Sequence, residues 1–176
     1  MKAYISITIL LLVVACTPHN KPTNPTILQT DSVYTEADFR KYGDYYNSQH
    51  QVYAIDLLSE GLNYDSAFHI TGSGCNLFLS DIFVENDSIM RIPAGIYCMD
   101  STATNMTFLH GMDFDGNITG TYMLNIQENQ IKQITLFKSG SMQVKYINNE
   151  IAIDFELYTK DSTRYHATYI GPATYR

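Results

Sequence analysis

The hydrophobic and polar positions of this chain alternate in short runs from residue 40 onward. Clusters of Gly, Asn, Asp and Ser separate the runs, and these residues favour turns because they tolerate left-handed or locally hydrogen-bonded backbone. Short apolar runs between turn formers are typical of β-strands. We predict nine strands, at residues 40–46, 51–58, 76–84, 95–100, 118–126, 130–137, 141–147, 151–158 and 164–170.

The alternation is clearest in residues 151–157. Ile, Ile, Phe and Leu fall on one face of an extended chain there, while Asp154 and Glu156 fall on the other. This pattern indicates one face on a core and one in water. The five predicted strands between residues 118 and 170 are joined by loops of hairpin length, Ser139-Gly140 among them. We therefore expect an antiparallel meander at the C-terminal end.

One short helix is predicted at residues 36–42. Thr35 is placed to cap its N-terminus, and Gly43 follows its last residue. The alternative is that residues 42–46 already open the first strand.

Many strands and at most one short helix predict an all-β domain. We expect an antiparallel β-sandwich of about nine short strands with the C-terminal meander, because the long loops 59–75 and 101–117 suit crossovers between sheets. The alternative is an up-and-down β-barrel of lipocalin type, which the meander favours.

The first fifteen residues have the pattern of a secretory signal. Lys2 provides the positive charge, and an apolar stretch follows that is too short to span a membrane. The next feature is Val13-Val14-Ala15-Cys16, which resembles the lipobox of bacterial lipoproteins. In that family the signal is cut before the cysteine, which is then lipidated, palmitate being one of the acyl chains. An ordinary signal peptide with a chance cysteine is the alternative.

The resemblance divides the chain into three parts. Residues 1–15 are the expected signal peptide, residues 16–31 the lipidated Cys16 with a proline-rich tether, and residues 32–176 a single all-β domain. The style of the domain loosely resembles small β-rich lipoproteins of Bacteroidota, and this resemblance implies no activity. Some lipoproteins of that group carry an acidic surface-export signal after the cysteine. Residues 17–29 have none, so we expect an outer-membrane protein that faces the periplasm, with exposure at the cell surface as the alternative.

The composition disfavours one class of function, and the cysteines raise the question of a disulfide. Eighteen Asp and Glu against eleven Lys and Arg give a net charge of −7, which disfavours nucleic acid. With Cys16 lipidated, Cys75 and Cys98 remain for one disulfide in an oxidising compartment. Two buried free thiols are the alternative.

Tyrosine is the most distinctive component, with 14 Tyr and no Trp. Tyr suits half-buried strands, so most of these rings are expected to cover the core. Exposed rings would instead offer flat faces to a sugar or a partner protein. The first candidates for such a surface are the residues that lie close together in sequence, which are Tyr45, Tyr46, Tyr53 and Tyr64.

Five Asp-Ser-x triplets resemble the O-glycosylation sequon of Bacteroidota envelope proteins. The resemblance implies modification at one or more of Ser32, Ser66, Ser88, Ser101 and Ser162. The alternative is that Asp-Ser makes turns.

No pattern of an enzyme or a cofactor site stands out. Asp113, Asp115 and Asn117 are a weak calcium candidate, because Gly116 falls too early and no bidentate Glu follows; a turn closed by these side chains is the simpler interpretation. The sequence therefore predicts a lipid-anchored envelope protein with a binding or structural role toward a protein or glycan. The alternatives are an envelope hydrolase with a site built from the long loops, and a small-ligand carrier if the fold is an open barrel.

Overall fold

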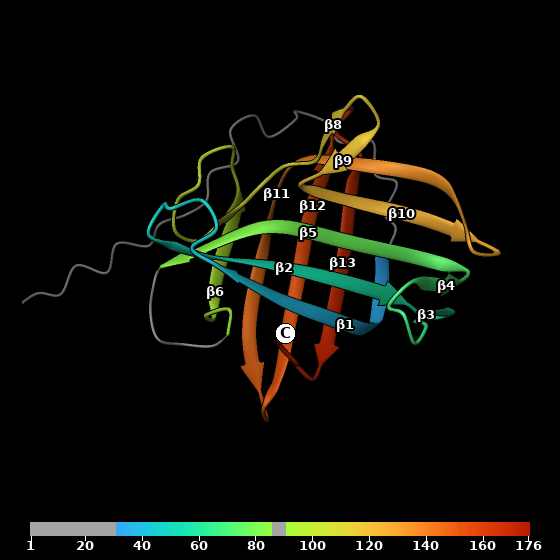
Figure 1. The fold of residues 1–176 in the computed structure, drawn as a ribbon, viewed down its shortest axis with the longest axis horizontal. Helices are drawn as coiled ribbons and strands as arrows, with labels where there is room; N and C mark the ends of the chain where they lie inside the picture. Colours follow the sequence, from blue (N-terminus) through green and yellow to red (C-terminus); the bar gives the residue numbers. More distant parts are fainter. Residues whose placement is uncertain (1–30, 86–90) are drawn as a thin grey trace, which may run out of the picture.

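Every regular element in the described part of the chain is a strand. The computed structural model describes residues 31–85 and 91–176, so the expected signal peptide, Cys16, most of the tether and Ser88 lie outside it. The strands are β1 (Asp31–Gly43), β2 (His50–Ser59), β3 (Leu62–Tyr64), β4 (Ile70–Gly72), β5 (Gly74–Glu85), β6 (Gly95–Met99), β7 (Thr107–Phe108), β8 (Met112–Phe114), β9 (Asn117–Thr119), β10 (Thr121–Gln127), β11 (Gln130–Ile147), β12 (Glu150–Thr159) and β13 (Arg164–Gly171). The predicted all-β class is confirmed (Figure 1).

The main sheet folds over into two facing layers that cross each other. β1, β2, β5 and β10 form one layer, and β11, β12 and β13 form the other, with β6 at the edge of β11. Figure 1 shows the first layer running across the second, as in a sandwich with steeply crossed sheets. The additional pairing β10–β5 completes the first layer, and the additional pairing β11–β6 adds β6 to the second, while the pairs β13–β1 and β10–β11 connect the two layers.

Two strands pass from one layer into the other at bulges. β1 changes register between Tyr34 and Glu36, and β11 between Phe137 and Ser139. Gly140 beside the second bulge has φ +148°, and a Cβ there would meet the backbone of Glu156 and Leu157. The interpretation of Ser139-Gly140 as a turn is therefore wrong, because the segment bends within one continuous strand of 18 residues.

The predicted meander is confirmed, since β10 to β13 pair in sequence order and antiparallel. Two pairs depart from the antiparallel pattern: β1 lies parallel to β13, and β6 parallel to β7. An up-and-down barrel has only antiparallel neighbours, so the barrel alternative does not describe this fold.

The predicted helix at residues 36–42 is wrong, because this segment is part of β1. Its backbone pairs with residues 53–58 of β2, and Phe39 is fully buried. A helix of seven residues is only marginally stable when local signals alone support it. Pairing with the sheet and burial in the core therefore decide the conformation of this segment.

The core between the layers is rich in tyrosine. Tyr34, Tyr53, Tyr97 and Tyr169 are buried. The Tyr34 and Tyr165 hydroxyls are 2.6 Å apart, and Tyr97 and Tyr169 each donate to a carbonyl oxygen at 2.9 Å. Buried phenols need such partners, so these rings are structural.

The predicted disulfide between Cys75 and Cys98 is wrong. Cys75 is a free, half-buried thiol on β5, opposite Asn125 of β10. Cys98 lies on β6 opposite Thr107, which pairs in turn with Phe83 near the other end of β5. At roughly 3.3 Å per residue along β5, this register keeps the two cysteines much further apart than the roughly 6 Å between Cα atoms that a disulfide needs.

Candidate functional site

A row of four outward side chains crosses the first layer on the side away from the core. Asp38 of β1 lies opposite Asp56 of β2, Asp56 opposite Phe78 of β5, and Phe78 opposite Tyr122 of β10. Their sequence neighbours, such as Phe39, point into the core. We call this side of β1, β2, β5 and β10 the outer face.

Two like charges lie directly opposite each other in this row, and both are buried. Asp38 is 4% exposed and Asp56 is 6% exposed. Like charges at such a position destabilise a sheet, so cations and donors must compensate them. Arg40 meets both, with its Nε 2.7 Å from Asp38 and its Nη2 3.2 Å from Asp56.

The remaining carboxylate oxygens are also occupied. Arg176 places its Nε 2.8 Å from Oδ1 of Asp38, and Asn76 donates to Oδ1 of Asp56. Each oxygen of Asp38 and Asp56 therefore has a donor. We call Asp38, Arg40, Asp56 and Arg176 the charge cluster.

The electrostatics of the cluster follow from burial. Burial raises the pKa of Asp56, although the hydrogen bond from Asn76 and the charge of Arg40 oppose the rise. Burial, reinforced by the negative charge of Asp56, raises the pKa of the Tyr64 hydroxyl. Since every oxygen of the two carboxylates is occupied, the cluster is suited to holding two guanidinium groups in place rather than to transferring protons.

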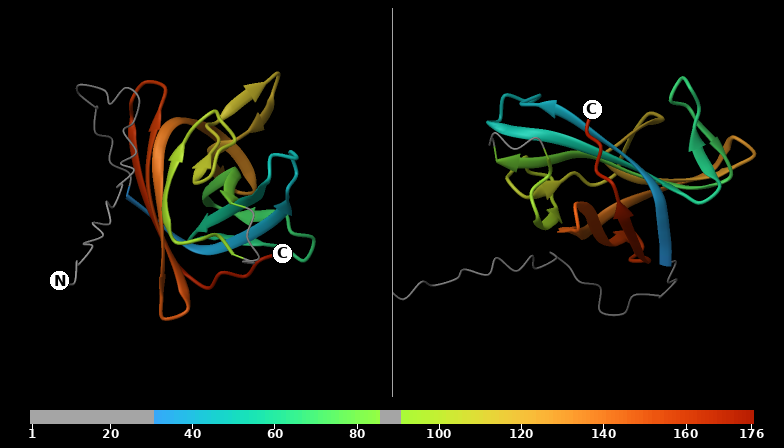
Figure 2. Two further views of the ribbon diagram at one scale, coloured as in Figure 1. Left: turned by 90° about the vertical axis from the view of Figure 1, so that its left-hand side faces the viewer. Right: turned by 90° about the horizontal axis from the view of Figure 1, so that it is seen from below.

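Aromatic rings surround the charge cluster. The Arg40 guanidinium lies 6.0 Å from the Phe78 ring centroid, and the Phe78 and Tyr122 centroids are 5.2 Å apart. Arg176 lies 4.0 Å from the ring centroid of Phe68, which is 61% exposed in the β3–β4 turn. That hairpin stands out from the layer, and the C-terminal residues run alongside β1 (Figure 2).

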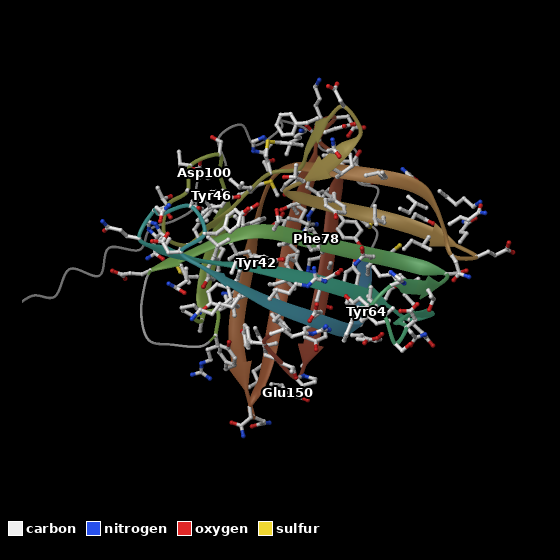
Figure 3. All side chains as sticks on the ribbon, in the orientation of Figure 1. Tyr42, Tyr46, Tyr64, Phe78, Asp100 and Glu150 are labelled. Carbon is white, nitrogen blue, oxygen red and sulfur yellow. The ribbon has the colours of Figure 1, made fainter. Side chains whose placement is uncertain are left out.

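A second group of rings lies at the β1–β2 connection. Tyr42, Tyr45 and Tyr46 are 48%, 69% and 48% exposed. Neighbouring ring centroids are 6.5 Å apart for Tyr42 and Tyr45 and 5.0 Å apart for Tyr45 and Tyr46. The Tyr46 ring also packs on Phe83, and its hydroxyl donates to Asp81 at 2.7 Å. Figure 3 shows Tyr42 and Tyr46 toward one end of the outer face, Phe78 near its middle and Tyr64 toward the other end.

The tyrosine surface predicted from the sequence is thus brought together only in part. Tyr45 and Tyr46 are neighbours in the exposed group. Tyr53 is 1% exposed in the core, and half-buried Tyr64 lies beside the charge cluster on β3. Close spacing in sequence does not gather these rings, because alternate residues of a strand face opposite sides.

The other predicted sites are separate from the outer face. Ser66 and Ser101 are exposed in loops, and Ser32 and Ser162 are half-buried. Asp65 and Asp100 each accept backbone N–H groups that follow them, as in Asx turns.

Residues 113–117 lie within the β8–β9 hairpin. Asp113 accepts the Gly116 N–H at 2.8 Å, so its carboxylate closes the turn. The residues that the structure describes include no group of three or more His, Cys, Asp or Glu able to hold a metal ion.

Sequence reasoning missed the charge cluster. The available signal was Asp56 within residues 51–59, since a lone carboxylate in an apolar strand demands a partner. The identity of the partner was not readable, because Arg40 and Arg176 come from a different strand and from the C-terminal segment.

Tyr46 offers a test of the exposed tyrosine group. Burial, followed by the hydrogen bond to Asp81 and its charge, raises the pKa of Tyr46 from 10.0 to about 12. A raised folded-state pKa means that the stabilisation is complete below about pH 10 and is lost as the pH rises to about 12. Tyr46→Phe should remove one component of the tyrosinate absorbance change seen on alkaline titration. We expect that component to titrate at about 12. Asp81→Asn should bring it back toward 10.0, and an unchanged titration in that variant would contradict the assignment.

The chain was compared with family models, curated proteins and solved structures. No family model, curated protein or solved structure matches the chain. Within the described ranges, the structure contains no apolar helix of membrane-spanning length.

Proposed function

We propose that this chain is a lipid-anchored protein of the bacterial envelope, held in the outer membrane by Cys16 and facing the periplasm. Its role is non-enzymatic binding of a glycan or partner protein through the outer face. The observation that carries the binding role is the charge cluster, in which the carboxylates orient Arg40 and Arg176 among aromatic rings. Arg, Tyr and Trp are enriched among the residues that dominate binding energy at recognition surfaces.

The hydrolase alternative is less well supported by the outer face. The loop 59–75 carries β3, β4 and Phe68 and does border the cluster. A general acid or base needs a carboxyl group that can exchange a proton with a substrate. All four oxygens of Asp38 and Asp56 are instead engaged by Arg40, Arg176 and Asn76.

The anchor is tested by metabolic labelling of the full chain with radioactive palmitate. We expect label in the native protein and none in Cys16→Ser, since the thiol of Cys16 would carry acyl chains. Cys75→Ser is the matched control and should keep the label, because Cys75 is a half-buried thiol of the folded domain. Label retained in Cys16→Ser would refute the anchor, and protease treatment of intact cells would show which side of the membrane the domain faces.

A further inference from the structure

The outer face presents oriented hydrogen-bond donors. A guanidinium group has five N–H bonds, and the ion pairs with Asp38 and Asp56 use two in Arg40 and one in Arg176. The two arginine side chains are 36% and 45% exposed. Their orientation is fixed before a ligand arrives, which lowers the entropic cost of binding.

The same face presents apolar ring surface next to these donors. Phe68 is 61% exposed, with the Arg176 guanidinium over one face of its ring at 4.0 Å from the centroid. Half-buried Phe78 lies against Arg40, and half-buried Tyr122 packs against Phe78. A ligand that fits must offer an apolar face to the rings and acceptors at its rim to the guanidinium groups. A pyranose ring has this combination, with C–H bonds on its face and hydroxyl groups around its edge.

Charge narrows the class of ligand further. The charge cluster contains two carboxylates and two guanidinium groups and is neutral as a unit. The whole chain carries a net charge of −7, which repels a polyanion. A cation finds the carboxylate oxygens already engaged by Arg40, Arg176 and Asn76.

We propose that the outer face binds a neutral saccharide, with a sugar ring packed against the part of the Phe68 ring that Arg176 leaves exposed and its hydroxyl groups bonded to Arg176 and Arg40. This inference rests on the proposed binding function and names its ligand class. Recognition of a protein partner is the competing possibility, and the experiment described next distinguishes the two.

The test uses the full-length protein in a detergent without a sugar headgroup. Binding is measured by calorimetry and by electrophoretic retardation in gels that contain dextran, mannan, xyloglucan or laminarin, with alginate and heparin as anionic comparators. We expect binding to at least one neutral polysaccharide and to neither polyanion. Phe68→Ala should weaken it about tenfold, the scale of one lost aromatic contact.

A matched control separates contact from general damage. Phe114 lies in the β8 hairpin and is 60% exposed, against 61% for Phe68, so Phe114→Ala should leave binding unchanged. Arg176→Lys keeps the charge beside Asp38 but loses the forked donors, and it should weaken binding as well.

Three outcomes would overturn the proposal: no binding to any neutral polysaccharide, preference for the polyanions, or equal effects of Phe68→Ala and Phe114→Ala. Cross-linking in intact cells then distinguishes failure of the saccharide as the ligand from failure of the binding function itself. A protein adduct that Phe68→Ala abolishes would keep the binding function and replace the saccharide with a protein. Loss of both saccharide binding and adduct would refute the binding function itself.

Discussion

Replacing Arg40 with methionine is expected to lower the free energy of unfolding by about 3 kcal/mol. The substitution keeps much of the side-chain volume but removes the cation shared by Asp38 and Asp56. Both carboxylates are less than 7% exposed, and a buried carboxylate without its partner cannot recover its hydration. Urea unfolding followed by circular dichroism measures the loss.

The loss should depend on pH in a defined direction. Burial already raises the pKa of Asp56, and removing Arg40 raises it further. A carboxyl group with a raised pKa binds its proton more readily in the folded state, so the variant gains stability as the pH falls from about 7 to about 4. The deficit relative to the native chain should therefore shrink on acidification, and Asp56→Asn combined with Arg40→Met should recover part of it at neutral pH.

Arg164→Met is the matched control for Arg40→Met. The Arg164 Nε lies 3.2 Å from Glu156, and the two side chains are 33% and 43% exposed. Arg164 and Arg40 are thus similarly exposed, but the carboxylate partner of Arg164 is in contact with solvent. Such surface pairs contribute about 0–1 kcal/mol. Equal losses in the two variants would mean that burial of the carboxylates has no special role.

The class of the fold could be predicted because it depends on local periodicity. In residues 151–157 the predicted inward positions are all buried, and Asp154 is exposed. Short polar loops likewise forced β10 to β13 into antiparallel neighbours. These features need no knowledge of distant residues, so one sequence is sufficient for them.

The layer arrangement depends on contacts that local patterns do not encode. Ser139-Gly140 has the composition of a hairpin turn, yet it forms a corner inside β11, because the strand continues past it beside β12 and β6. The parallel pairing of β1 with β13 brings together the two ends of the domain. A bend and a turn use the same small residues, and only the long-range pairing distinguishes them.

The candidate site was hidden for the same reason. Its charged residues come from β1, β2 and the C-terminal segment, and none lies in a recognisable motif. The tyrosine count did indicate exposed rings correctly at Tyr45 and Tyr46, but Phe68 and Phe78 carry the surface beside the arginines. Aromatic content can be read from a sequence, whereas the side of the sheet that a ring occupies depends on register.

Phe39→Ala is expected to cost about 4 kcal/mol, more than Arg40→Met, because it leaves a cavity where the layers meet the C-terminal segment. Phe39 is fully buried, and its ring centroid lies 6.3 Å from that of Tyr169 and 5.2 Å from that of Tyr175. Its carbonyl oxygen also accepts the Arg176 N–H at 2.9 Å. The loss should therefore extend to the charge cluster, since Tyr175 and Arg176 are positioned by this contact.

Phe39→Leu separates the effect of the cavity from the effect of losing ring contacts. We expect it to lose less than half as much unfolding free energy as Phe39→Ala, because leucine fills most of the space. Phe114→Ala, at a ring that is 60% exposed, should change stability by less than about 0.5 kcal/mol. Urea unfolding gives the three free energies, and amide hydrogen exchange at Arg176 reports whether the C-terminal contact loosens. A loss below about 1 kcal/mol in Phe39→Ala, outside the range of buried aromatic truncations, would show that the C-terminal segment does not depend on this ring.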